Sequence, residues 1–283
     1  KLDYRINHIA RGLKTRRSMT IGVLIPRFDN FFYSRMISCI ETILSAKGYS
    51  TISCAYQDNA EIEREKLNFL LGKSVDGVLL VPLGAVSGCV AILKKSPIPV
   101  VMIDRVCDGF KSDTVLSDNQ GAIYEAVKYL ADKNHRRIGV ILGPEGVYTA
   151  DERYCGFCRA VRDFDLDADS RLVRRGNYGT DSGRACAAEL LALDPRPTAL
   201  LITNCEMTVG AIIALEAAQV KAPEQMSLIG FDNLDLARAI QPHLCTVVQN
   251  IDGMSRAAVG LLLDRIDGKS SDSFSGVVFD TRL

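Results

Sequence analysis

Polar and aromatic side chains follow most of the apolar runs in this sequence of 283 residues. Carboxylates and amides bind hydroxyl groups, arginine donates hydrogen bonds, and aromatic rings cover the apolar face of a sugar. A phosphate group would favour glycine-rich loops instead. These residue types therefore indicate a site for a small polyhydroxylated ligand. The residues concerned are 27–30, Gln57, Asp58, Asp104, Arg105, 143–145, Asn177, Tyr178, Asn204, Asp232 and Asn233.

The apolar runs predict β-strands, and the amphipathic stretches between them predict helices. Strands that are nearly continuous in hydrophobic residues are typical of parallel sheets covered on both faces. Such sheets bind ligands beside the carboxyl ends of their strands, which is where the polar residues above stand. The expected strands are residues 21–26, 51–55, 77–82, 100–103, 137–142, 199–203, 227–231 and 277–279. The expected helices are residues 32–47, 60–71, 88–95, 121–133, 151–164, 181–192, 206–218 and 253–266.

The order of these elements predicts an α/β fold class with two doubly wound parallel-sheet lobes. A chain of this length usually divides, because single hydrophobic cores stop growing at about this size. One helix follows two complete lobes and indicates that the chain crosses back to the first. We therefore expect residues 1–18 to form a separate segment, residues 19–117 and 250–274 one lobe, and residues 118–249 and 275–283 the other.

The composition excludes several classes of protein. The 34 basic and 34 acidic residues cancel, and 47% of the residues are hydrophobic, which excludes intrinsic disorder. The longest uncharged stretch is interrupted by proline and glycine, so no membrane partner is expected. Nine cysteines, spread singly along the chain, do not form a disulfide framework. We therefore expect a location in the reducing cytoplasm.

The positive charge is concentrated in the first 18 residues, which hold six basic side chains and one acidic one, for a net charge of +5. Ile6, Ile9, Ala10 and Leu13 stand there at helical spacing. A solvated basic tail is the structural alternative. The segment is too short to bury an apolar stripe alone, and Gly12 costs a helix ~1 kcal/mol relative to alanine, so a helix requires a partner. A nucleic-acid phosphate backbone would supply one, with Leu13 as an apolar wedge in a minor groove.

The same segment resembles the hinge of the LacI/GalR family of bacterial transcription repressors. The family's pattern Tyr-x-x-Asn-x-x-Ala-Arg-x-Leu, followed by a basic stretch and a first strand, appears as Tyr4, Asn7, Ala10, Arg11 and Leu13 before residues 21–26. Each further match is weak alone, but their order and spacing together are specific and cover essentially the whole chain. These matches are residues 29–32, 48–49, 76–77, 99–104, 118–119, 153–157, 227–233 and 261–265.

The resemblance implies a regulator with two lobes of the type I periplasmic-binding-protein kind, an effector between them, and a hinge helix that folds on operator DNA. The hinge positions that would contact DNA are Asn7, Ala10, Arg11, Leu13 and Lys14. Members normally carry a helix-turn-helix headpiece before the hinge. The sequence begins at the hinge, so we expect the headpiece to be missing and specific DNA binding to be weakened. A homodimer is the expected assembly.

The family's effector pocket falls mostly on the strand ends chosen above. We expect Arg153, Asp232 and Asn204 to bind ligand hydroxyls, Asp104 to contribute from the opposite lobe, and aromatic rings to pack against the ligand. One departure is Cys205, where many members have an aspartate, and it alters the polar network. The effector positions are Asn30, Phe31, Phe32, Gln57, Asp104, Thr149, Arg153, Tyr178, Asn204, Asp232 and Gln249.

Several of these residues also have a structural interpretation. Asp104 and Asp232 are of a type that shapes turns, and Phe31 or Phe32 would serve equally as core. Cys155-Gly-Phe-Cys158 has redox spacing, but it lies inside a predicted helix, so we expect it to pack. The three histidines are far apart in the sequence, so neither a metal nor another cofactor is expected.

We therefore expect a ligand-responsive, DNA-binding transcriptional repressor whose effector is a sugar or sugar derivative. A periplasmic sugar-binding protein, with the same two lobes, is the alternative, and the cysteines and the basic hinge argue against export. An enzyme is not expected. The sequence holds no Gly-x-x-x-x-Gly-Lys-Ser/Thr loop, Gly-x-Ser-x-Gly elbow, Gly-x-Gly-x-x-Gly fingerprint or His-Glu-x-x-His pair.

Overall fold

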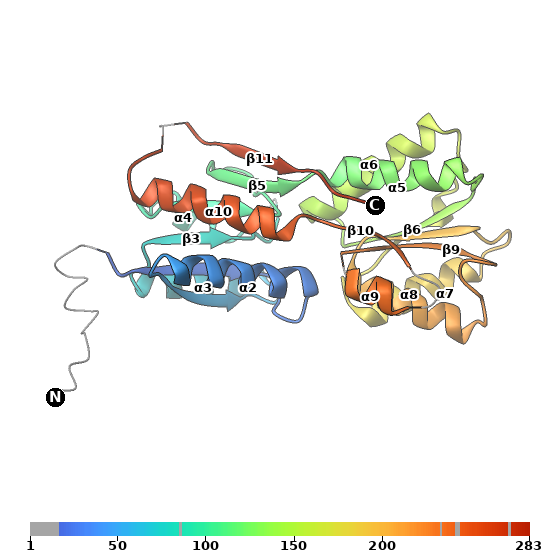
Figure 1. The fold of residues 1–283 in the computed structure, drawn as a ribbon, viewed down its shortest axis with the longest axis horizontal. Helices are drawn as coiled ribbons and strands as arrows, with labels where there is room; N and C mark the ends of the chain where they lie inside the picture. The colour runs from blue at the N-terminus through green and yellow to red at the C-terminus, as the bar shows by residue number, and fades with distance from the viewer. Residues whose placement is uncertain (1–16, 85–86, 233, 241–243, 271–272) are drawn as a thin grey trace. The chain divides into compact units, whose positions relative to one another are not determined.

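The computed structural model describes residues 17–84, 87–232, 234–240, 244–270 and 273–283 (Figure 1). All five predicted DNA-contacting positions, from Asn7 to Lys14, lie outside these ranges. The described residues form two compact units. Unit 1 holds the described residues up to Asp29, Tyr33–Leu116 and Ile251–Val277. Unit 2 holds Asn30–Phe32, Ser117–Asn250 and Val278–Leu283.

Unit 1 is built around a sheet with the strand order β11-β5-β4-β3-β1-β2. The pairings among β1 to β5 are parallel. The strands are β1 (Thr20–Ile25), β2 (Ser50–Ala55), β3 (Gly77–Leu80), β4 (Val100–Ile103), β5 (Asp113–Ser117) and β11 (Gly276–Phe279). The helices are α2 (Phe31–Ala46), α3 (Ala60–Gly72), α4 (Val90–Leu93) and α10 (Ile251–Ile266).

Helices α3 and α10 cover opposite faces of this sheet. A Cβ atom added at Gly22 of β1 would stand 3.1 Å from the Leu70 side chain of α3, and one added at Gly77 of β3 would stand 2.9 Å from Leu262 of α10. Gly77 pairs with Ile21, the neighbour of Gly22, and side chains alternate along a strand, so the two glycines point to opposite faces. The strands are therefore covered on both sides, as their hydrophobic runs predict.

Unit 2 is built around a second parallel sheet, with the order β10-β9-β8-β6-β7. Its strands are β6 (Ile138–Leu142), β7 (Val173–Arg175), β8 (Ala199–Ile202), β9 (Ser227–Phe231) and β10 (Cys245–Val247). Its helices are α5 (Asn119–Asp132), α6 (Tyr148–Asp163), α7 (Thr180–Leu191), α8 (Cys205–Ala217) and α9 (Leu234–Ala239), with a short 3₁₀ turn at Ser170–Leu172.

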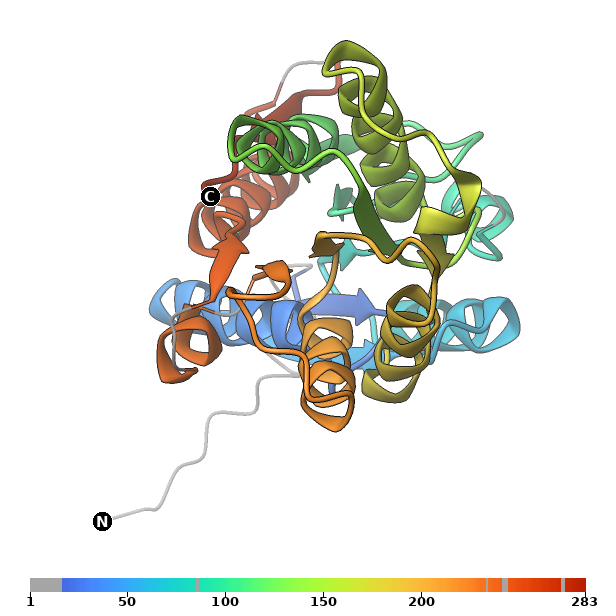
Figure 2. The same cartoon turned by 90° about the vertical axis from the view of Figure 1, so that its right-hand side faces the viewer.

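The unit 2 sheet separates two hydrophobic clusters. Val140 and Leu142 of β6 pack with α5 and α6, whereas Ile141, between them, packs with α7 and α8. Figure 2 shows the two helix pairs on either side of the strands. Helices α5 and α6 cross at Gly156, where a Cβ atom would stand 2.4 Å from the carbonyl oxygen of Gln120. Glycine is therefore required at the point that sets α6 against α5.

This architecture confirms the predicted fold class. Strands β5, β7 and β10 and helix α9 are additions to the expected elements, and the helix expected at residues 88–95 shortens to α4. Strand β5 buries the polar residues Asp113 and Ser117, so its sequence does not read as a hydrophobic run. Strand β7, Val-Arg-Arg, is a half-buried edge strand of three residues.

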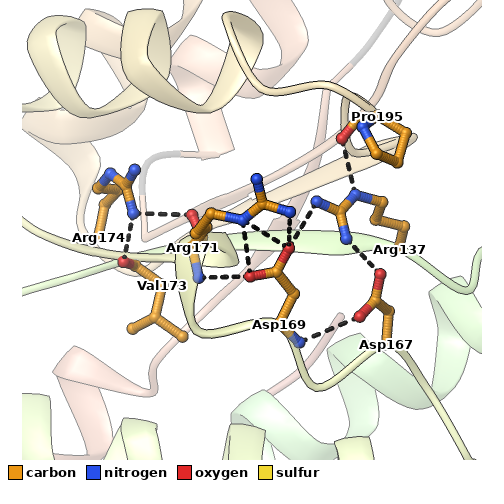
Figure 3. Close-up of polar contacts among 7 residues, drawn as sticks. All are labelled: Arg137, Asp167, Asp169, Arg171, Val173, Arg174 and Pro195. Carbon is orange, nitrogen blue, oxygen red and sulfur yellow. Dashed lines mark hydrogen bonds and ion pairs between the residues drawn. The ribbon is translucent and has the colours of Figure 1, made fainter.

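An ion-pair network holds the loop that leads into β7 (Figure 3). Arg137, at the start of β6, pairs with Asp167 and, through Nη2, with Asp169 at 2.9 Å, while its Nε donates to the Pro195 carbonyl oxygen at 2.8 Å. Arg171 Nε donates to Asp169 Oδ2 at 3.0 Å. Arg171 and Arg137 hold the pKa of Asp169 well below its ordinary value. The loop is therefore tied to the unit 2 sheet wherever Asp169 is ionised.

A buried ion pair connects β5 with α10 inside unit 1. The Asp113 carboxylate accepts hydrogen bonds from Arg265 Nε at 2.7 Å, from Arg265 Nη2 at 2.9 Å and from the Ser275 backbone N–H at 2.7 Å. Burial raises the pKa of Asp113, but the Arg265 and Ser275 hydrogen bonds outweigh it, and the net pKa is lowered. The ionised carboxylate therefore stabilises the folded state.

Asp113→Asn is expected to lower the free energy of unfolding at neutral pH by about 3 kcal/mol, because Arg265 keeps its charge and loses its anionic partner. A lowered folded-state pKa gives stability that is present above the unfolded value of about 3.9 and is lost as the pH falls through the folded value. Urea denaturation at neutral and acid pH measures both effects. Asp264→Asn, at an exposed position next to Arg265, is the control. A difference between wild type and Asp113→Asn that persists unchanged in acid would contradict this account.

Candidate ligand-binding site

Unit 2 places six of the predicted effector residues at or just beyond the carboxyl ends of its strands. Thr149 and Arg153 lie on α6, which follows β6, and Tyr178 follows β7. Asn204 comes two residues after β8, Asp232 directly after β9, and Gln249 two residues after β10. Because parallel strands end at the same edge of a sheet, these side chains share the carboxyl edge of unit 2. We call them the edge residues.

The guanidinium group of Arg153 is clamped from three sides. Its Nε donates to Asn119 Oδ1 at 2.8 Å, and its Nη1 donates to the Thr203 carbonyl oxygen at 2.6 Å. The guanidinium carbon lies 4.1 Å from the centre of the Phe231 ring. Asn119 is fixed in turn by its donation to the Ser117 carbonyl oxygen at 3.2 Å. These are the hydrogen bonds of Arg153 within the described residues, so its Nη2 amino group remains as a donor for a ligand.

Asp232 and Gln249 form a buried hydrogen-bonded pair, in which the Gln249 amide donates and the Asp232 carboxylate accepts. Gln249 Nε2 donates to Asp232 Oδ1 at 2.9 Å, and the two residues are only 4% and 7% exposed, respectively. A flipped amide would turn oxygen toward carboxylate, so this hydrogen bond fixes the orientation of Gln249. Its Oε1 atom is buried and has no hydrogen-bond partner among the described residues. A buried acceptor of this kind calls for a donor.

Asn204 begins α8 and also positions an acidic side chain. Its Oδ1 accepts from the Met207 N–H at 2.9 Å, as an N-cap residue does, and its Nδ2 donates to Glu206 Oε2 at 2.7 Å. Glu206 also accepts from Asn30 Nδ2 at 2.9 Å and from the Phe31 N–H at 2.8 Å. The sequence alone does not single out Glu206. The sequence feature that could have identified Glu206 is its place in the first turn of α8. It directly follows Cys205, the position at which many family members have an aspartate.

Tyr178 and Thr149 form the aromatic side of the edge. The Tyr178 hydroxyl lies 3.3 Å from Thr149 Oγ1. The Tyr178 ring crosses the start of the loop after β6, where a Cβ atom on Gly143 would stand 2.1 Å from the ring. Tyr178 has φ +63° and Asp232 has φ +69°, so both residues adopt the left-handed backbone conformation. The turn-shaping role that the sequence allows for Asp232 is therefore present together with its side-chain hydrogen bond.

Two other predicted residues lie on unit 1. Asp104 is buried, has φ +66° and accepts from the Tyr33 hydroxyl at 2.9 Å, and Arg105 Nε lies 3.7 Å from it. Gln57, with φ +53°, is exposed after β2. Both stand at the carboxyl edge of the unit 1 sheet, and their role as effector contacts stays a prediction. Tyr33, the partner of Asp104, is a residue that the strand-end rule does not select.

The sequence leaves open which of the neighbouring residues Phe31 and Phe32 belongs to the core. Phe32 is buried, with 5% of its surface exposed, whereas Phe31 is half-buried and contributes its backbone N–H to Glu206. Phe32 is therefore the core residue of the pair.

The structure corrects the expected packing of the Cys-x-x-Cys pair. Cys155 and Cys158 both lie exposed on α6, and the buried position of that turn is Phe157 instead. Within the described residues, no three His, Cys, Asp or Glu side chains are arranged to hold a metal ion. None of the described helices combines the length and hydrophobicity needed to span a bilayer.

The fold is that of a chain with two parallel-sheet units and a candidate ligand site, and comparison with known proteins gives its family. The family model of the periplasmic binding protein-like domain matches residues 127–276. The catabolite control protein A of Priestia megaterium is 32% identical over 274 residues, covering 96% of this chain and 82% of the relative. The transcriptional repressor PurR of Pasteurella multocida (strain Pm70) is 31% identical over 273 residues, with the same coverage of 96% and 82%.

Solved structures agree with these relatives. The complex of the transcriptional regulator CelR with cellobiose superposes with a TM-score of 0.86 at 28% identity, covering 97% of this chain and 87% of that one. The chain belongs to the LacI/GalR family of bacterial transcription regulators, as the motifs of its sequence indicate.

Arg153→Lys is expected to lower the free energy of unfolding by about 2 kcal/mol, because one ammonium group cannot serve both Asn119 and Thr203 while stacking on Phe231. Chemical denaturation at neutral pH measures this change. Arg162→Lys, at an exposed position on the same helix, is the matched control and is expected to change stability by less than about 0.5 kcal/mol. Equal stabilities of the two variants would show that the clamp contributes nothing.

Proposed function

We propose that this chain is the regulatory part of a sugar-responsive transcriptional repressor. A carbohydrate effector binds at the carboxyl edge of unit 2 through the edge residues. Its binding changes the affinity of the protein for operator DNA. The repressor acts in the cytoplasm as a homodimer, and the bound sugar is a signal that leaves the protein chemically unchanged.

The observation that carries this proposal is the Gln249–Asp232 pair. A buried amide oxygen without a partner accepts a hydrogen bond from a hydroxyl group, and the adjacent carboxylate accepts others. Arg153 Nη2 supplies a donor at the same edge. A sugar hydroxyl both donates and accepts, so the hydroxyl groups of a sugar can serve a donor and acceptors at the same edge. A simple anion would leave Gln249 Oε1 unpaired and would face Asp232.

The aromatic side of the edge supports a sugar as well. Tyr178 offers a ring face, and apolar C–H groups on one side of a sugar pack against such a face. The CelR structure contains cellobiose, and that protein is similar to this chain over nearly its whole length. A disaccharide is therefore the first ligand to test.

The DNA-binding side of the proposal rests on the basic segment before β1. The described end of that segment is attached to unit 1 by polar contacts. Arg17 Nη1 donates to Asp267 at 2.8 Å, Arg17 Nη2 donates to the Ile266 carbonyl oxygen at 2.9 Å, and the Ser18 N–H donates to Asp76 at 2.7 Å. A hinge that starts from unit 1 would respond to changes in the arrangement of a dimer. Asn7, Ala10, Arg11, Leu13 and Lys14 remain the proposed DNA contacts.

Isothermal titration with cellobiose, glucose, ribose and their phosphates tests the effector site. We expect at least one neutral sugar to bind the wild-type chain, and Asp232→Asn to weaken it by about tenfold or more through loss of a charged acceptor. Asparagine tolerates the left-handed backbone at this position, so the variant is expected to fold. Glu216→Gln, on an exposed part of α8, is the control and should bind as the wild type does. Sugar phosphates binding best, or equal binding by Asp232→Asn, would exclude the proposed site.

Binding of the protein to operator DNA tests the regulatory claim. The sugar that binds is expected to change operator affinity, and operator DNA is expected to change sugar affinity by the same factor. A complete switch requires the sugar to prefer one state by ~5.5 kcal/mol. Fluorescence anisotropy of a labelled operator duplex, with and without sugar, measures the coupling. Unchanged operator affinity at saturating sugar would contradict the proposal, and recovery of a modified sugar would identify an enzyme.

A further inference from the structure

A cavity lies in unit 2, and none of the edge residues lines it. It has a volume of about 550 Å³ and is lined by residues from the first half of α5, by Arg159 of α6, by Val247 of β10 and by the chain after β11. This volume is within the range of cavities that hold small molecules. Apolar Ala122 and Val247 lie in its wall together with charged side chains. The proposed function makes no use of this cavity.

Among the residues that line this cavity, Arg159 combines a stacked guanidinium group with a buried N–H donor. Its guanidinium carbon lies 4.3 Å from the centre of the Tyr124 ring, which fixes the plane of the group. Its Nε atom is buried and has no hydrogen-bond partner among the described residues. Within those residues, Arg159 forms no ion pair either. A buried N–H donor without an acceptor is costly, so it points to an oxygen acceptor that the described part of the chain does not provide.

The same wall carries two carboxylates that other protein groups do not engage. Glu125 and Asp280 line the cavity, and neither has a hydrogen bond or ion pair within the described part of the chain. Asp118 also lines it, but its Oδ1 is occupied by the Gly121 N–H at 2.8 Å, where it caps α5. The wall therefore offers one cationic donor, two carboxylates that are unengaged within the described residues, and a third, Asp118, that is engaged through one oxygen.

This combination selects among ligand classes. A simple anion would satisfy Arg159 but would face Glu125 and Asp280. A simple cation would satisfy the two carboxylates and leave the buried Arg159 Nε without an acceptor. A neutral hydroxyl would serve both kinds of group, but only through hydrogen bonds in which the ligand carries no charge. A small zwitterion serves both with charge-assisted hydrogen bonds, its carboxylate on Arg159 and its ammonium group near the two carboxylates, and such bonds are stronger.

We propose that this cavity is a second small-molecule site, which binds a free α-amino acid with an apolar side chain. The carboxylate accepts from Arg159, the ammonium group donates to Glu125 or Asp280, and the side chain contacts Ala122 and Val247. The site uses none of the edge residues and does not depend on the sugar proposal.

Three related probes separate the ligand classes by calorimetry on the whole chain. L-leucine carries both charges, N-acetyl-L-leucine keeps only the carboxylate, and L-leucinamide keeps only the ammonium group. We expect L-leucine to bind about tenfold more tightly than either of the other two, because each loses one charged hydrogen bond. N-acetyl-L-leucine binding as tightly would indicate an anion site, and L-leucinamide binding as tightly would indicate a cation site. Either result overturns the proposal, as does the absence of L-leucine binding, in which case water serves Arg159.

Matched variants locate the binding site. Arg159→Gln and Asp280→Asn are each expected to weaken L-leucine by about tenfold. Arg162→Gln is the control on the same helix, because the Arg162 side chain is 77% exposed and pairs with Asp163. If Arg159→Gln fails to fold, Arg159→Lys keeps the charge, lacks the Nε donor and is expected to weaken L-leucine binding measurably while remaining folded. Equal binding by wild type and the Arg159 variants, or loss of binding in Arg162→Gln, would overturn the proposal.

Discussion

The buried guanidinium group of Arg153 is the constraint on which the unit 2 edge depends. One cation is held by a side-chain oxygen from the start of α5, by a backbone oxygen at the end of β8 and by an aromatic ring at the end of β9. A charge buried in this way is stable only while its hydrogen bonds and its stacking partner are kept in place. These contacts therefore join α6 to the ends of two strands. They also fix the position of the Arg153 Nη2 amino group.

The backbone contributes to the edge as much as the side chains do. Asp104, Tyr178 and Asp232 all adopt a left-handed φ directly after, or just beyond, a strand. A chain that leaves a buried parallel strand must turn at once, and aspartate is among the residues that tolerate this conformation best. The same residue then serves two purposes, since the turn that requires it also presents its carboxylate at the sheet edge. The structural role of these positions is therefore compatible with the ligand-binding role proposed for them.

Most of the fold follows from the sequence because buried parallel strands leave continuous hydrophobic runs, and residues such as Asn204 and Asp232 stand directly at their ends. The exceptions have physical causes. Strand β5 buries Asp113 against Arg265, a residue 152 positions away, so its polar sequence conceals its burial. Short edge strands such as β7 contain too few apolar residues to be predicted from a hydrophobic run.

The sequence gives the residue types of the proposed site but not their connections. The partners of Arg153 lie 34 and 50 positions from it, and one of them is a backbone carbonyl that no residue type reveals. Glu206 escapes notice because its contacts depend on how Asn204 turns while capping α8. In the sequence, Arg159 is indistinguishable from other basic residues of an amphipathic helix. Its stacking on Tyr124 is evident only in the structure. Long-range contacts of this kind are what the three-dimensional structure adds.

A crystal structure of the chain grown with the tightest-binding neutral sugar tests the central claim most directly. The account predicts a sugar hydroxyl within hydrogen-bonding distance of Gln249 Oε1, with Arg153 still held by Asn119 and Thr203 and donating through Nη2. A sugar bound away from the carboxyl edge of unit 2, or an Arg153 side chain that leaves its clamp to reach the ligand, would contradict it.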